Sequence, residues 1–123
     1  MPVLKWGLVG MVAAIFAYTG AVMLREGADF LSPFLAAIWS VTWPGQFALD
    51  FLFYLLLSGA WVAWRQGGGV AGLALGLACA TMGAVVFLPW LLVVTLRAGG
   101  DPERLILGPG RAARRGTATP PAP

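Results

Sequence analysis

The chain has 123 residues, of which 59% are hydrophobic and 11% are charged, with a formal net charge of +3. A soluble domain of this length buries only part of its surface, so it could not hide so many apolar side chains. One cysteine and no histidine exclude an internal disulfide and histidine-based catalysis. Three long apolar runs predict an all-α membrane protein with three transmembrane helices and a short interfacial helix.

The first apolar run covers residues 3–24, with Lys5 as its only early charge and Arg25 directly after it. About 20 helical residues cross the roughly 30 Å hydrocarbon core, so this run predicts the first span. A cleaved signal peptide is the alternative. The run is longer than a usual signal-peptide core and has no clear cleavage site, which favours a retained span.

Residues 33–43 are apolar but too short to span a bilayer. Ser32 is a suitable helix cap and Pro33 fits the first turn, where its missing N–H is tolerated. Trp39 and Trp43 are typical anchors at the membrane surface. We therefore expect a short interfacial helix over 33–43, the alternatives being an extension of the next span or a helix buried within the bundle.

Two further spans are predicted over residues 44–64 and 70–96. Pro44 can begin the second span, and the glycines that follow Arg65 supply a tight turn. Pro89 lies inside the third run, where we expect it to kink the helix.

The tail from 101 to 123 differs in composition from the rest of the chain. Asp101 can cap one short helical turn. Residues 108–123 are rich in Gly, Pro, Ala, Thr and Arg, which predicts disorder because such a segment cannot bury a core.

The basic residues predict the orientation of the three spans. Lys5 and Arg65 would lie on one side of the membrane, and six arginines would lie on the other. An excess of basic residues marks the cytoplasmic side, so we expect a cytoplasmic tail. The six are Arg25, Arg97, Arg104, Arg111, Arg114 and Arg115.

Asp50 is the only acid well inside a predicted span. An ionised carboxylate at mid-membrane costs at least about 2.5–3.5 kcal/mol, so it should be protonated, paired, or facing protein or water. Gln46 and Tyr54 lie one helical turn away on either side. Arg25 and Arg97 end the neighbouring spans. We favour a structural carboxylate that ties the helices together over one that titrates or binds a ligand.

A stripe of small residues follows one face of the third run: Gly68, Gly72, Gly76 and Gly83, with Cys79 among them. Small residues let two helix backbones approach closely. We expect packing within the chain rather than homodimerisation. Cys79 has no histidine or charged neighbour to activate it, so we interpret it as a packing residue rather than a nucleophile.

The order of landmarks resembles that of small bacterial three-helix integral membrane proteins of unknown function. The matching motifs are Trp43-Pro44, Phe47-Ala-Leu-Asp50 and Trp61-Val-Ala-Trp-Arg65, and the resemblance covers about residues 3–97. It departs from the pattern at Gln66, where an acid would be expected. The resemblance implies a three-helix membrane fold and no particular activity.

We therefore expect a non-catalytic scaffold or accessory subunit of a larger assembly, multi-pass in the cell's inner membrane. Its partners would be the lipid bilayer and other membrane subunits or a second copy, without cofactor, metal or nucleic acid. A transporter or channel component using Asp50 is the first alternative. A membrane enzyme acting on a lipid or isoprenoid is the second, and it would need Glu26 or Asp29 as a further acid.

Overall fold

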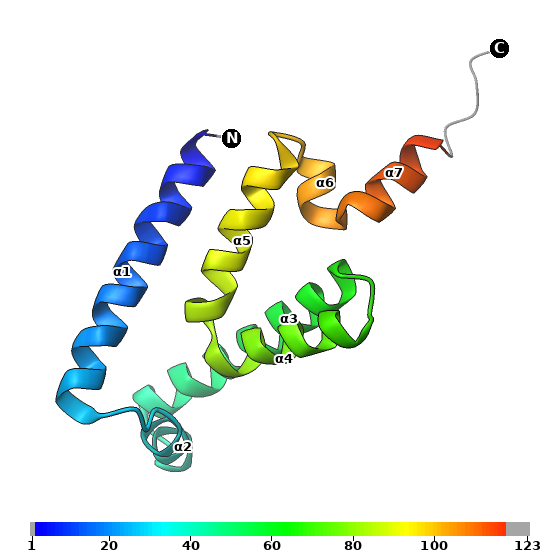
Figure 1. The fold of residues 1–123 in the computed structure, drawn as a ribbon. Coiled ribbons are helices and arrows are strands. Elements are labelled where there is room, and N and C mark those ends of the chain that lie inside the picture. Colours follow the sequence, from blue (N-terminus) through cyan, green and yellow to red (C-terminus); the bar gives the residue numbers. More distant parts are fainter. Residues whose placement is uncertain (1, 118–123) are drawn as a thin grey trace.

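The computed structural model describes residues 2–117, and this part of the chain is helical without a strand. The predicted all-α class is therefore confirmed (Figure 1). Helices α1 (Pro2–Glu26) and α3 (Trp43–Arg65) are the two that are long and apolar enough to cross a membrane by length and composition. They coincide with the apolar runs predicted over 3–24 and 44–64.

Helix α2 (Leu31–Trp39) starts two residues before the segment predicted over 33–43 and ends four residues before its end. Phe30, rather than Ser32, is the N-cap residue, and it makes no side-chain hydrogen bond to the first turn. Asp29, directly before it, caps the turn instead, because its Oδ1 accepts a hydrogen bond from the Ser32 backbone N–H at 3.1 Å. The helix stops before Val41, whose φ of 51° is incompatible with a right-handed helix. The chain then turns into α3.

The third apolar run is two helices rather than the single span predicted over 70–96. Helices α4 (Val70–Met82) and α5 (Ala84–Ala98) have 13 and 15 residues. Their lengths are about 20 and 22 Å, short of the roughly 30 Å hydrocarbon core. The break lies at Gly83, with φ 63° and ψ −137°, a conformation that glycine adopts far more readily than other residues.

Helix α5 continues through Pro89 to Ala98, so this proline, where we expected a kink, does not end the helix. Pro89 lies in the second turn of α5. It therefore removes a single hydrogen bond close to the helix start, where the loss is best tolerated.

The tail contains two short helices, α6 (Pro102–Leu107) and α7 (Pro109–Thr117). Asp101 caps α6 as expected, accepting hydrogen bonds from two backbone N–H groups of the first turn at 2.9 and 3.4 Å. The sequence predicted disorder where α7 forms, because composition does not reveal that this segment packs on the end of α3. Residues 118–123, the rest of that segment, lie outside the described residues.

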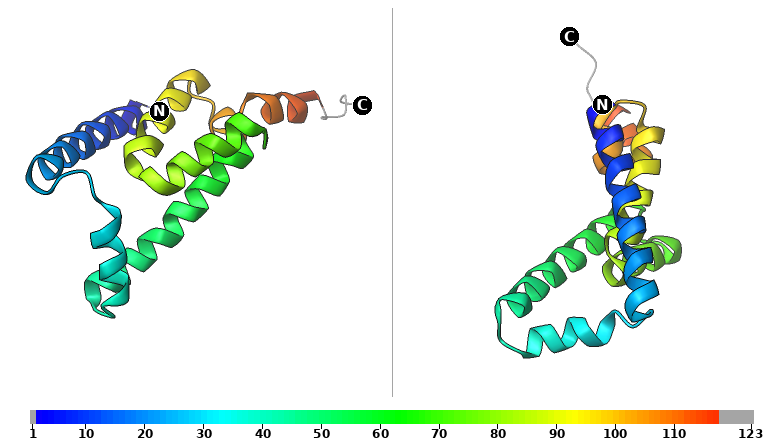
Figure 2. Two further views of the ribbon diagram at one scale, coloured as in Figure 1. Left: turned by 60° about the horizontal axis from the view of Figure 1, so that its bottom comes forward. Right: turned by 90° about the vertical axis from the view of Figure 1, so that its left-hand side faces the viewer.

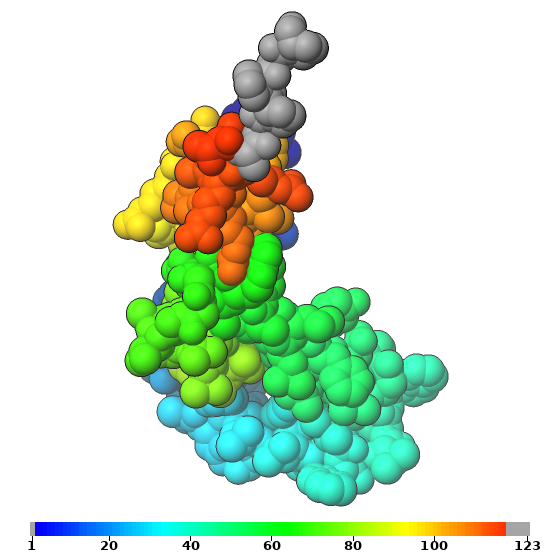
Figure 3. Space-filling model, turned by 90° about the vertical axis from the view of Figure 1, so that its right-hand side faces the viewer, coloured from blue at the N-terminus to red at the C-terminus, as the bar shows by residue number. Residues whose placement is uncertain are grey.

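The helices are arranged as two antiparallel pairs (Figures 1 and 2). Helix α4 packs back along α3, α5 packs along α1, and α2 connects the far ends of α1 and α3. The N-terminal end of α1 lies with the end of α5 and with α6, whereas α2 lies at the opposite end. Figure 3 shows α6 and α7 covering one end of the α3–α4 pair.

Helices α3 and α4 pack with their backbones in close approach. A Cβ atom placed on Gly59 or on Gly76 would lie 2.6 Å from the carbonyl oxygen of the other glycine. Val62 and Cys79 are fully buried beside this contact. Outside it, most apolar side chains remain exposed. The accessible surface is 8,684 Å², whereas a compact monomer of this mass exposes about 6,300 Å².

Candidate functional site: an arginine-rich end

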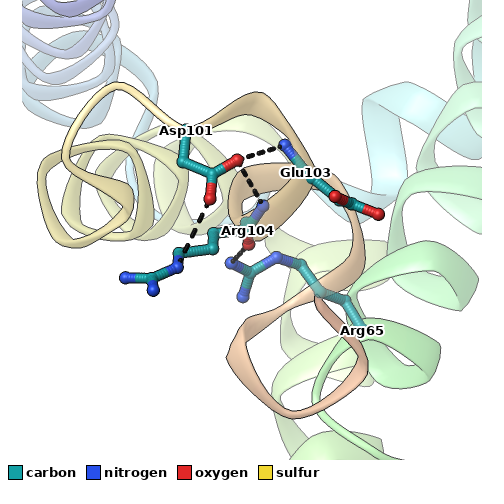
Figure 4. Close-up of polar contacts among 4 residues, drawn as sticks. All are labelled: Arg65, Asp101, Glu103 and Arg104. Atoms are coloured by element: carbon teal, nitrogen blue, oxygen red, sulfur yellow. Dashed lines mark hydrogen bonds and ion pairs between the residues drawn. The ribbon is translucent and has the colours of Figure 1, made fainter. Parts of the chain in front are cut away.

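Arg65, the last residue of α3, is buried despite its charge. Its Nε donates to the carbonyl of Leu105 at 2.6 Å. Its Nη2 donates to the carbonyl of Arg104 at 3.1 Å (Figure 4). The Leu105 carbonyl has no donor within the helix, because the residue four positions on is Pro109, so Arg65 supplies one. The Arg104 carbonyl also accepts from the Gly108 N–H at 3.1 Å, and Arg65 is its second donor. One side chain therefore joins the end of α3 to α6.

This guanidinium contacts one ring of a cluster of three aromatic side chains. The Arg65 guanidinium carbon lies 5.3 Å from the centre of the Trp90 ring, a cation–π contact. Trp90 packs edge-to-face on Trp61 at 5.6 Å, and Phe87 lies about 6 Å from both tryptophans. The indole N–H of Trp90 is buried and has no hydrogen-bond partner among the described residues. The cluster shields one face of Arg65 from solvent.

Arg111 fixes α7 against α3. It donates from Nη1 to the carbonyl of Trp64, and its guanidinium lies 4.2 Å from the centre of the Trp64 ring. The approach is close, because a Cβ atom placed on Gly108 would lie 3.0 Å from the Arg65 carbonyl oxygen. Arg114, one turn further along α7, makes no side-chain hydrogen bond or ion pair with the described residues.

Two cavities flank Arg65. The larger, about 360 Å³, is lined by Arg65, Arg111 and Arg114 among others. The smaller, about 230 Å³, is lined by Arg65, Arg97 and Arg104 among others. No Asp or Glu of the described chain lines either cavity.

The two acids of this end pair with Arg104, which lines the smaller cavity, and with Arg115, which lines neither cavity. Asp101 lies 3.3 Å from Arg104, and Glu103 lies 3.5 Å from Arg115. Both ion pairs are well exposed, and such pairs contribute little to stability. The two cavities therefore keep an excess of positive charge.

The polar cluster predicted around Asp50 does not form. Asp50, Gln46 and Tyr54 are all exposed, and Asp50 makes no hydrogen bond or ion pair with any described residue. Arg25 and Arg97 end α1 and α5. Because these helices are antiparallel, their C-terminal ends lie at opposite ends of the molecule (Figure 1). The reversal at Gly83 produces this difference from the prediction.

The glycines of the predicted stripe have different surroundings. Gly76 lies against Gly59 of α3, and Gly72 faces the end of the same helix. A Cβ atom placed on Gly83 would lie 3.0 Å from Leu55 Cδ2, whereas one on Gly68 would meet nothing within 4 Å. The stripe thus faces α3 from its second glycine onward.

The arginine-rich end was not anticipated from the sequence, which assigned Arg65 and the tail to opposite sides of a membrane. Arg65 contacts α6 directly, so a bilayer cannot separate them. Gly83 was the available signal, since a glycine within a run that also contains a proline is a second possible break point.

Comparison with protein-family models, curated proteins and solved structures yields no match. The resemblance to small three-helix membrane proteins therefore stays a prediction, and the interpretation of the site depends on its geometry.

Proposed function

We propose that the protein is a non-catalytic accessory subunit of a larger membrane assembly, with two spans instead of three. Helices α1 and α3 cross the bilayer, and α2 lies in the interface at one end. Helices α4 and α5 enter from the opposite, arginine-rich end and return to it. Few residues of α1 and α3 are buried within the chain, which argues against their being core helices of a soluble protein.

The start of α4 and the end of α5 lie close together, which supports the proposal that these two helices enter and leave the membrane on the same side. Helix α4 begins a few residues after Arg65, and α5 ends with Arg97 in its last turn. Arg65 and Arg97 line the same 230 Å³ cavity. The two arginines are therefore on one side of any bilayer that the chain crosses.

The charge distribution supports an orientation. Seven of the eight lysines and arginines belong to the end formed by the start of α1, the ends of α3 and α5, and helices α6 and α7. Arg25 alone belongs to the α2 end, beside Glu26 and Asp29. Basic residues concentrate on the cytoplasmic side of membrane proteins. The arginine-rich end then faces the cytoplasm, with the start of α1 and helix α7 on that side.

The exposed carboxylate of Asp50 is the main observation that supports the accessory role. It lies seven residues into α3, about 10 Å along the helix, and it is exposed without a partner in the described chain. An unsatisfied carboxylate facing lipid is costly. A neighbouring polypeptide that supplies a hydrogen-bond donor would remove this cost, and the exposed apolar faces of α1 and α3 offer it a large surface.

The two-span topology is tested by labelling single cysteines with a membrane-impermeant maleimide in a Cys79→Ala background. Positions 69 and 116 suit Gly→Cys changes, since a Cβ atom there meets nothing within 4 Å. We expect Gly69→Cys and Gly116→Cys to react from the same side and Ala28→Cys from the opposite side. Labelling of positions 69 and 116 from opposite sides would restore the three-span arrangement.

The accessory role is tested by substitutions at Asp50 and by the size of the assembly on native gels in mild detergent. We expect Asp50→Asn to keep the complex, because the amide still forms hydrogen bonds, and Asp50→Leu to lose it. A transporter that needs a titrating carboxylate would instead assemble with Asp50→Asn but lose transport. An Asp50→Leu variant that assembles like the wild type would contradict the accessory role.

A further inference from the structure

We infer that the larger cavity, between the end of α3 and α7, binds the phosphate group of an anionic membrane lipid. This inference rests on the proposed membrane placement and deepens it by assigning a ligand to the arginine-rich end. The cavity measures about 360 Å³, which falls within the usual range for small-ligand sites.

The cavity offers donors that the fold leaves available. Arg65 uses Nε and Nη2 for the carbonyls of α6, and Arg111 uses Nη1 for the carbonyl of Trp64. A guanidinium carries five N–H groups, so both side chains retain free donors. Arg114 has no side-chain partner among the described residues. Planar guanidinium groups match phosphate oxygens in geometry as well as in charge.

No carboxylate of the described chain competes inside this cavity, since its acidic neighbours pair outside it. Contacts within the fold hold two of the three arginines in place, namely Arg65 on Trp90 and Arg111 on Trp64. Prepositioned donors reduce the entropy lost when a ligand binds.

The position of the cavity favours a lipid over a soluble phosphate compound. It lies at the end of α3, beside Trp64, in the zone where tryptophans of membrane proteins meet the headgroups. Lipid phosphates are permanently present at that depth. Basic pockets of this kind on the cytoplasmic side suit anionic headgroups. Inorganic phosphate shares the same chemistry and is the alternative occupant that an experiment must separate.

The test is native mass spectrometry of the full chain in detergent, titrated separately with phosphatidylglycerol and with phosphatidylcholine. We expect the wild type to bind phosphatidylglycerol more tightly. Arg114→Gln should weaken that binding about five-fold, the effect of one arginine near an anionic lipid surface. Arg114 holds no other described group, so this variant tests binding without removing a structural contact.

Arg115→Gln is the matched control. It removes the same charge from the neighbouring position of α7, but Arg115 does not line the cavity. We expect its affinity for phosphatidylglycerol to equal that of the wild type. Equal weakening by Arg114→Gln and Arg115→Gln would overturn the inference, because it would indicate general charge attraction. An absent preference for phosphatidylglycerol would overturn it as well.

A competition experiment with inorganic phosphate distinguishes a lipid phosphate from free phosphate as the ligand. Failure of millimolar phosphate to displace phosphatidylglycerol is the expected result. Saturable phosphate binding that Arg114→Gln abolishes, without a preference between the two lipids, would assign the cavity to free phosphate and overturn the lipid inference. Cysteine labelling tests the membrane topology independently. The expected labelling pattern together with no preference for phosphatidylglycerol would contradict the lipid site but not the proposed topology.

Discussion

Arg65 is the residue on which the arginine-rich end depends. It donates to two carbonyls of α6, 39 and 40 positions further along the chain, and it lies over the Trp90 ring. From the sequence, Arg65 is predicted to be the basic residue at the end of the second apolar helix. A cation at this place is expected to stabilise the C-terminal carbonyls of its own helix. Only the fold reveals that the carbonyls to which Arg65 donates belong to a different helix.

Arg65→Gln should release α6 and α7 from α3. Hydrogen bonds from a charged donor contribute about 1.5–3 kcal/mol each, and glutamine cannot reach both carbonyls with the same geometry. We expect faster amide hydrogen exchange over residues 102–117 than in the wild type. Arg25→Gln removes the same charge at the opposite end and should leave this region protected. Equal protection in both variants would show that Arg65 does not hold α6.

Asp29 governs the start of α2. Hydrogen bonds from the Ser32 side chain and then from its backbone N–H hold the pKa of the Asp29 carboxyl below its ordinary value. A lowered folded-state pKa means that the ionised cap stabilises the helix start above about pH 4, the unfolded value. The contribution is lost as the pH falls through the lowered folded-state pKa.

The corresponding measurement is the NMR chemical shift of the Ser32 amide in micelles as a function of pH. We expect a titration with a midpoint below the ordinary aspartate value in the wild type. Asp29→Asn retains an acceptor oxygen but cannot ionise, so its curve should be flat over that range. A midpoint at or above the ordinary value would rule out this capping arrangement.

At the scale of elements, Gly83 decides where α5 runs. Its φ of 63° with ψ of −137° reverses the chain between α4 and α5, and Leu55 packs beside it. A continuous helix over this run would carry α5 away from α1 and from the arginine-rich end. The pairing of α5 with α1 therefore follows from a single backbone conformation.

Gly83→Ala should destabilise the protein by about 1–3 kcal/mol, because alanine adopts this conformation only with strain. Pro89→Ala is the matched variant. It restores an N–H that can bond to the Val85 carbonyl, so its melting temperature in detergent should equal or exceed that of the wild type. The opposite ranking of the two melting temperatures would place the decisive break at Pro89.

At the scale of the whole molecule, the two helix pairs enclose little core. The buried apolar side chains gather around the α3–α4 contact and near the end of α5, for example Val62, Cys79 and Val94. Most of the exposed large apolar side chains belong to α1 and α3. Such a surface requires lipid, detergent or another protein to cover it.

The protein should therefore stay in the membrane fraction after extraction with alkaline carbonate, which removes peripheral proteins but not spanning helices. The apolar faces of α1 and α3 would lose their lipid contact on release, and that loss is the physical reason for retention. Recovery in the soluble fraction as a dispersed monomer would contradict the membrane placement.

The sequence by itself determined the helical class, the two long apolar helices, the start of α3 near Pro44 and the Asp101 cap. These features depend on local composition, periodicity and capping chemistry, all of which can be read from neighbouring residues in the sequence. The tertiary structure alone decided that the third run folds back at Gly83, that Arg65 meets α6, that α7 forms and that Asp50 has no partner in the described chain. Each of these depends on which helix faces which, and that choice is made by contacts between residues distant in sequence.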